Sequence, residues 1–190
     1  MRYLQALIAA AILIAPSVVF GQGAPGGAPA TPPPPPFTLS STSFQDGGVI
    51  PDKYTQANAA GAISPELEWV NVPAGTVSYV LLMHDPDNAP QKKLMDTLHW
   101  MMFNIPASTA KLPEGVPNDP TLPDGSVQLK TRTAGFMGPG ARGIYHHYTI
   151  ELFAMDTKLS LGPDATHQQV QDAMDGHILG KAVVEGRFHR

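Results

Sequence analysis

The hydrophobic pattern of this chain is mostly that of β-strands. Residues 78–86 (SYVLLMHDP) and 97–106 (TLHWMMFNIP) are nearly continuous apolar runs, which predicts two central strands covered on both faces. Residues 37–44 alternate apolar and polar side chains, as expected of a half-buried strand at a sheet edge. Three further segments have strand character, at residues 67–72, 144–156 and 181–188.

One segment has helical character, and one long segment is predicted to be mostly loop. Residues 163–180 (PDATHQQVQDAMDGHILG) predict a short helix that Asp164 caps and that either Gly176 or Gly180 ends. Residues 107–140 are rich in proline and glycine, which predicts long loops with one short strand at residues 127–130. Loops of this length in a compact domain usually serve a function.

Together these patterns predict a mainly β domain of roughly eight strands, with one or two short peripheral helices and long loops. The chain has 190 residues, 43% of them hydrophobic and 15% charged, which suits one domain, expected at residues 37–190. It contains no cysteine, so disulfides, thiolate nucleophiles and cysteine metal sites are excluded. With 12 lysines and arginines against 16 acidic residues, it has no electrostatic footprint for nucleic acid.

The N-terminal residues have the composition of a secretory signal followed by a tether. Residues 1–21 combine Arg2, an apolar run and small residues before Gln22, which predicts a signal peptide cleaved after Gly21. The alternative is a permanent membrane anchor, since the apolar run approaches the roughly 20 residues that span a bilayer. Either way the domain is expected outside the cytoplasm, in the periplasm or secreted.

Residues 22–36 (QGAPGGAPATPPPPP) form a Gly/Ala/Pro-rich segment that cannot bury apolar surface. We interpret it as a solvated linker with a polyproline end. A ligand for a proline-recognition domain is the alternative interpretation.

Polar residues gather at the ends of the predicted strands. Asp85 and Asp87 come at the end of the first central strand, His99 lies near the start of the next, and a His-His-Tyr run opens a third. Alternate residues of a strand face the same way, so Asp85 and Asp87 are expected to share a side, and so are His146 and Tyr148. His147 is expected to point the other way. One pocket could therefore hold two carboxylates, two imidazoles and a phenol.

Several chemistries fit such a pocket. Two histidines and a carboxylate are common zinc or iron ligands, although the spacing matches no recognised metal motif. Paired carboxylates leave a hydrolytic acid and base open, whereas no Gly-x-Ser-x-Gly elbow points to a nucleophilic serine. Anion binding fits the remaining features better, because backbone N–H groups can approach an oxyanion closely at glycines, here Gly135, Gly138, Gly140 and Gly143.

Three blocks carry a resemblance to a known family. DPDNAP at residues 85–90, LHWMMFNIP at 98–106 and GPGARGIYHHY at 138–148 resemble, in this order, the signature blocks of the phosphatidylethanolamine-binding protein family. The chain is most similar to the bacterial Raf-kinase-inhibitor-like branch, over residues 37–188. The resemblance implies a β-sandwich with a small pocket at one end for phosphoryl head groups.

The resemblance also implies the site residues. The positions that match the family's motifs are Asp85, Asp87, Pro90, His99, Gly138, Pro139, His146 and Tyr148. Three features depart from the pattern: Asn88 is inserted in the first block, His147 stands where the family has arginine, and residues 140–142 replace a more proline-rich stretch.

From these residues we expect a binding protein without catalytic turnover, metal or cofactor. Its expected ligand is a phospholipid head group or a small phosphoryl anion such as phosphoethanolamine. His99 and His146 are expected to donate to the anion. Asp85 and Asp87 are expected either to fix the imidazole tautomers or to receive an ammonium group, and to favour protonated histidines. The resemblance also implies a second kind of partner, a kinase or protease inhibited through contacts at the pocket mouth.

Overall fold

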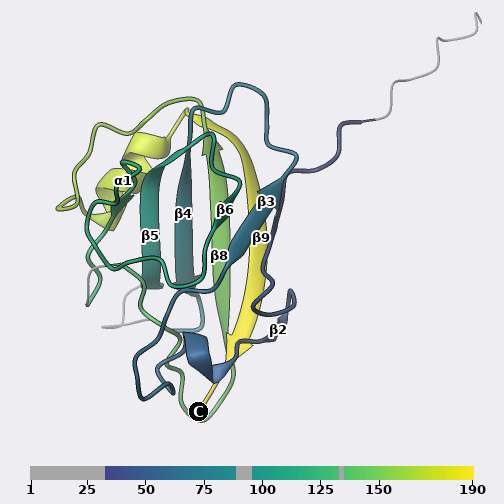
Figure 1. Cartoon of the computed structure of the whole chain (residues 1–190), viewed down its shortest axis with the longest axis vertical. Coiled ribbons are helices and arrows are strands. Elements are labelled where there is room, and N and C mark those ends of the chain that lie inside the picture. The colour runs from purple at the N-terminus through teal and green to yellow at the C-terminus, as the bar shows by residue number, and fades with distance from the viewer. Residues whose placement is uncertain (1–32, 89–95, 133–134) are drawn as a thin grey trace, which may run out of the picture. The chain divides into compact units, whose positions relative to one another are not determined.

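The computed structural model describes residues 33–88, 96–132 and 135–190, and this part folds into two β-sheets (Figure 1). The first sheet has the strand order β1 (Thr38–Ser40), β3 (Leu67–Val70), β6 (Lys111–Leu112). The second has the order β2 (Gly48–Val49), β9 (Ile178–Phe188), β8 (His146–Met155), β4 (Ser78–Asp85), β5 (Thr97–Pro106), β7 (Val127–Gln128). All pairings between these strands are antiparallel except that of β2 with β9. The predicted mainly β sandwich is confirmed.

The strands of the described residues number nine, one more than expected from the sequence. The two-residue strands β2 and β6 are too short to leave a hydrophobic pattern, and each exists only through pairing with a distant segment. Two short helices accompany the sheets, η1 (Asp52–Tyr54) and α1 (His167–Met174).

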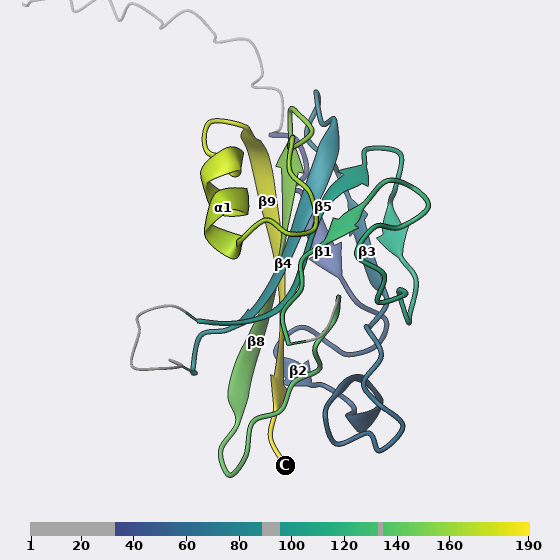
Figure 2. The ribbon, with the colours of Figure 1, turned by 90° about the vertical axis from the view of Figure 1, so that its left-hand side faces the viewer.

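The six-stranded sheet is covered on both faces, which explains the continuous apolar runs of β4 and β5. Figure 2 shows α1 on one face of this sheet and the smaller sheet on the other. Side chains of β4 alternate between the two sides, so Val80 packs in the cluster under α1 while Leu81 packs between the sheets. The predicted burial of both central strands is confirmed.

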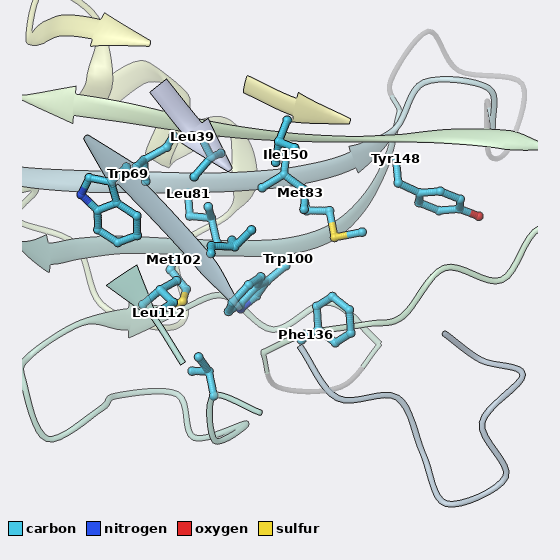
Figure 3. Close-up of a cluster of buried hydrophobic side chains, with 14 of the residues drawn as sticks. Leu39, Trp69, Leu81, Met83, Trp100, Met102, Leu112, Phe136, Tyr148 and Ile150 are labelled. Atoms are coloured by element: carbon cyan, nitrogen blue, oxygen red, sulfur yellow. The ribbon is translucent and has the colours of Figure 1, made fainter. Parts of the chain in front are cut away.

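The core between the sheets joins side chains from both layers (Figure 3). Leu39 and Trp69 come from the small sheet and meet Leu81 and Ile150 of the large one. Trp69 packs edge-on against Tyr79, with 5.3 Å between ring centroids, a favourable aromatic geometry. Tyr148 lies at one end of this core in Figure 3, which places its hydroxyl at the boundary between core and loops.

Helix α1 begins two residues later than expected. Its cap is Thr166, whose hydroxyl accepts the N–H of Gln169 while the Gln169 side chain accepts the N–H of Thr166. This capping box satisfies two backbone donors at once, so the predicted cap at Asp164 is wrong. The helix ends at Met174, and Gly176 follows with a φ of 81°, a conformation that favours glycine.

One buried glutamine organises the long loops between β5 and β8. The Oε1 atom of Gln128 accepts the indole N–H of Trp100 at 2.7 Å. Its amide nitrogen donates to the carbonyls of Pro117 and Asp119, at 2.7 and 2.8 Å. The short strand predicted at residues 127–130 is present as β7, and Gln128 ties the surrounding loop to the central strand β5.

The N-terminal predictions concern a different part of the chain. The proposed signal peptide at residues 1–21 and most of the linker at 22–36 lie outside the described residues. Residues 33–36 are exposed and have no regular structure, and the compact unit extends over Pro35–Arg190. Within the described part, no helix has the length and apolar character needed to cross a bilayer.

Candidate functional site

The candidate site lies where three central strands meet. Strand β4 runs antiparallel to both β5 and β8, so its last residue lies beside the first residues of its two neighbours. Asp85 pairs in register with Thr97, and His84 pairs with Thr149. The polar side chains that the sequence placed at three separate strand ends therefore lie together at one end of these central strands.

A cavity of about 130 Å³ opens at this end. Its lining residues are Gln56, Asp85, Asn88, Thr97, His99, Arg132, Met137, Gly140, Ala141, His146 and Tyr148. Four of the eight predicted site residues are among them: Asp85, His99, His146 and Tyr148. Asp87, Gly138 and Pro139 are not, and Pro90 lies outside the described residues.

Asp85 and His146 form the central pair of the cavity. The Asp85 side chain is almost fully buried, with 2% of the residue exposed. Its Oδ2 accepts the Nδ1–H of His146 at 2.8 Å, and its Oδ1 accepts the N–H of Asp87 at 2.9 Å. With Nδ1 committed to a carboxylate, the tautomer is fixed and Nε2 is the ring nitrogen left for a ligand.

Tyr148 closes the inner end of the cavity. Its hydroxyl oxygen accepts the N–H groups of Gly140 and Ala141, at 3.2 and 3.1 Å. Burial raises the pKa of the Tyr148 phenol above its usual range, so the hydroxyl stays protonated at neutral pH. The N–H of Gly140 thus donates to the Tyr148 hydroxyl, and that of Gly143 donates to the carbonyl of Arg190. The expectation that these two glycines cradle an anion is therefore wrong.

His99 differs from His146 in its protonation. Its Nδ1 donates to the carbonyl of Met137 at 2.8 Å, and its ring packs edge-on against Tyr148. Burial lowers the pKa of His99, although the hydrogen bond to Met137 and the charge of Asp85 oppose this shift. The expectation of a protonated, donating His99 is therefore wrong: at neutral pH its Nε2 is an acceptor.

Asp87 does not line the cavity, contrary to expectation. Its Oδ2 accepts the backbone N–H of His147 at 2.7 Å and approaches the Nδ1 of the same residue to 2.8 Å. These hydrogen bonds lower the pKa of Asp87. Asp87 follows the end of β4 in a turn, so strand alternation no longer decides its direction. It forms an exposed pair with His147 instead.

Gly138 and Pro139 support the cavity wall from behind. The Gln56 side-chain amide donates to the carbonyl of Gly138 at 2.9 Å, and the Gln56 N–H donates to the carbonyl of Pro139 at 2.8 Å. A Cβ atom at Gly138 would lie 2.5 Å from the Cβ of Ala62. Gly138 therefore allows a close approach of two loops, and its role at the site is structural.

Sequence reasoning missed further lining residues, among them Arg132 and Gln56. Arg132 is the only permanent cation among the lining residues, and it comes from the long loop segment after β7. The sequence did contain a feature that could have identified Arg132, since it is the one arginine in a long loop segment of the kind that often carries function. Gln56 follows η1 and had no comparable signal.

Among the described residues, no three histidines, aspartates or glutamates are placed to hold a metal ion. A second cavity of about 260 Å³ lies on the α1 side of the large sheet. His84, Asp96, Glu151 and His167 are among its lining residues, and no lysine or arginine lines it. It is therefore less suited to an anion than the cavity at Asp85.

Comparisons with known proteins agree with this architecture. Residues 40–189 match the family model described as phosphatidylethanolamine-binding protein. A UPF0098 protein of Methanothermobacter thermautotrophicus is 42% identical over 156 residues, which cover 81% of this chain and 99% of that protein. The UPF0098 protein YbhB of Escherichia coli is 32% identical over 159 residues, covering 79% and 98%.

Solved structures show the same relationship. The crystal structure of the homologue CT736 from Chlamydia trachomatis has a TM-score of 0.72 at 31% identity, covering 82% of this chain and 98% of that one. E. coli YbcL, described as a member of the mammalian PEBP family, has a TM-score of 0.71 at 27% identity, covering 81% and 98%. The chain belongs to the phosphatidylethanolamine-binding protein family, in the branch of YbhB and YbcL.

Proposed function

We propose that the cavity binds the phosphoryl group of a phospholipid head group or of a small compound such as phosphoethanolamine, without turnover. The observation that carries this proposal is the presence of Arg132 and the Asp85-held His146 on the wall of one small cavity. A guanidinium and an imidazolium are the side chains best suited to donate to phosphoryl oxygens. The family's description as phosphatidylethanolamine-binding supports the same ligand class.

The arginine and the two histidines of the cavity have different roles in this proposal. Arg132 supplies a permanent charge, and His146 presents Nε2 to the ligand, since its Nδ1 is committed to Asp85. His99 stays neutral and accepts a hydrogen bond through Nε2, since burial lowers its pKa and Nδ1 is committed. A ligand with both anionic oxygens and an N–H or O–H donor satisfies this set, and a phosphoethanolamine zwitterion has both.

The size of the cavity limits what part of a ligand it can hold. Its volume of about 130 Å³ is well below the roughly 300–1,000 Å³ of pockets for drug-sized ligands. A head group fits this space, whereas the acyl chains of a lipid would remain outside.

Calorimetric titration with phosphoethanolamine tests the proposal. We expect saturable binding by the wild-type chain, and at least roughly tenfold weaker binding by Arg132→Gln, since a charge-assisted contact contributes about 1.5–3 kcal/mol. Arg187→Gln is the matched control, because Arg187 is exposed and does not line the cavity. Equal losses in both variants, or no binding by the wild type, would refute the proposal.

A substitution at His146 gives a second test. Because Nδ1 of His146 is committed to Asp85, Nε2 is the ring nitrogen that can reach a phosphoryl oxygen. His146→Ala is therefore expected to weaken phosphoethanolamine binding, and an unchanged affinity would contradict a contact between His146 and the ligand. Turnover is tested separately by phosphorus NMR, in which release of inorganic phosphate would contradict a purely binding role.

We further propose that the domain works outside the cytoplasm. Support comes only from residues 1–21, whose charge, apolar run and small residues fit a cleaved signal. Mass spectrometry of the protein recovered from the expressing cells tests this proposal. An uncleaved chain in the soluble cytoplasmic fraction would contradict it.

A further inference from the structure

We infer that residues 142–145, here called the tip, dock the cavity onto a phospholipid membrane. The inference rests on the proposed function, because it identifies the source of the phosphoryl group as a lipid in a bilayer. Residues 140 and 141 and His146 line the cavity, so the tip is the turn between two parts of the cavity wall. Figure 2 shows this turn before β8 at the same end of the fold as the C-terminus.

The tip carries apolar side chains into solvent. Ile144 is 71% exposed, the largest exposed fraction among the large exposed hydrophobic residues of the described part, and Tyr145 is 46% exposed. Single exposed apolar residues are ordinary, but here an aliphatic and an aromatic residue are consecutive at the rim of a polar cavity. Tyrosine is enriched at membrane interfaces because one end of its ring is apolar and the other polar.

Contacts from the end of β9 and from the two residues after it hold the tip in place. The Tyr145 ring packs against His189, with 4.1 Å between centroids, and the Arg187 guanidinium lies 5.7 Å from the Tyr145 centroid. The N–H of Gly143 donates to the carbonyl of Arg190, and the N–H of Arg190 donates to the carbonyl of Ala141. These contacts orient Tyr145 and leave Ile144 projecting into solvent.

Positive charge surrounds the same end of the fold. All the arginines of the described residues contact the tip, belong to it or line the cavity: Arg132, Arg142, Arg187 and Arg190. Asp85, Asp87 and Asp96, which precedes the lining residue Thr97, are each paired with a histidine, and Asp46 accepts the N–H of Glu185 on β9. The whole chain has a formal net charge of −4, so this concentration of arginine is local.

Apolar side chains between arginines match the chemistry of a bilayer surface that contains anionic lipid. Ile144 would enter the boundary between head groups and acyl chains, while the arginines remain among the phosphates. The cavity, too small for a whole lipid, would then face a head group whose chains stay in the bilayer. A protein partner is the competing occupant of the tip, and an unresponsive label at position 144 in the vesicle experiment below would favour it.

The absence of cysteine from the chain allows a site-specific test. Ile144→Cys in the full chain is labelled with an environment-sensitive fluorophore and mixed with vesicles of phosphatidylethanolamine and phosphatidylglycerol. Val70→Cys is the matched control, since Val70 is 57% exposed and lies on β3, away from the cavity. The label reports only its own surroundings, so binding through another part of the chain does not imitate insertion of the tip.

We expect the emission at position 144 to rise and shift to shorter wavelength with added vesicles, and the emission at position 70 to stay unchanged. Raising the salt from about 50 mM to about 500 mM should increase the lipid needed several-fold, because salt screens the arginines. No response at either position, or the same response at both, would overturn the inference.

Phosphoethanolamine titration of the unlabelled chain keeps the two proposals apart. Binding of the soluble compound with no response at position 144 would leave the head-group proposal standing and refute membrane docking. A response at position 144 without binding of the soluble compound would support docking and refute the cavity as the phosphoryl site.

Discussion

Oδ2 of Asp85 lies 2.8 Å from Nδ1 of His146 inside the cavity. Two residues after Asp85 and one after His146, the same pairing recurs on the exposed surface, where Asp87 and His147 also approach to 2.8 Å. The two pairs have nearly the same geometry and opposite surroundings. The fold therefore contains one such pair inside the cavity and a second, exposed pair that can serve as its control.

Asp85→Asn is expected to weaken phosphoethanolamine binding by roughly ten- to a hundredfold, the range found for carboxylates that orient metal-binding histidines. An amide no longer fixes the His146 tautomer in which Nε2 faces the ligand. Asp87→Asn should leave the affinity within twofold of wild type, because Asp87 does not line the cavity. Calorimetry measures both, and an equal loss in the two variants would show that Asp87 also acts on the ligand.

Stability is expected to fall on mild acidification because of His99. Burial lowers the pKa of His99 in the folded state, while in the unfolded chain the ring takes up a proton near pH 6.5. Between these two pKa values the unfolded state binds more protons, so the free energy of unfolding decreases as the pH falls below about 6.5.

The slope from His99 alone is at most about 1.4 kcal/mol per pH unit. Urea unfolding of wild type and His99→Gln between pH 7.5 and 5.5 measures it, and the variant should show a shallower decline. Parallel curves for the two proteins would mean that His99 is not the group responsible.

Gly138→Ala is expected to destabilise the fold by about 1–3 kcal/mol, the cost of overpacking a close contact. The added Cβ would lie 2.5 Å from the Cβ of Ala62 and 2.9 Å from the carbonyl oxygen of Tyr54. At Gly162 a Cβ meets nothing within 4 Å, so Gly162→Ala serves as the control and should be nearly neutral. Urea midpoints compare the two, and a neutral Gly138→Ala would mean that the two loops separate easily.

Gln128→Leu is expected to cost about 2–4 kcal/mol of unfolding free energy, because the indole N–H of Trp100 and two loop carbonyls lose their buried partner. Hydrogen exchange of the Trp100 indole should accelerate in the variant. The exposed Gln168 makes one surface hydrogen bond, to Asp172, so Gln168→Leu should change stability by less than about 0.5 kcal/mol. Similar small effects in both variants would mean that the loop is held by other contacts.

Local patterns in the sequence determined most of the sheet. The continuous apolar runs at β4 and β5 predict strands buried on both faces, because alternate residues of a strand face opposite sides of the sheet and both sets are apolar here. Helix α1 is predicted by the spacing of its apolar residues. The motifs likewise predicted four of the cavity residues, Asp85, His99, His146 and Tyr148, because strand register brings the ends of three neighbouring strands together.

Only the tertiary structure decided what surrounds those four residues. Asp87 turns outward because it follows the strand end, and Arg132 and Gln56 reach the cavity from loops whose paths depend on contacts with distant segments. The neutral state of His99 depends on its burial, which no local pattern records. The sequence by itself determined which side chains the strands carry to the cavity. Loop packing and burial decided which further side chains line the cavity and whether its histidines are charged, because both depend on residues far apart in the chain.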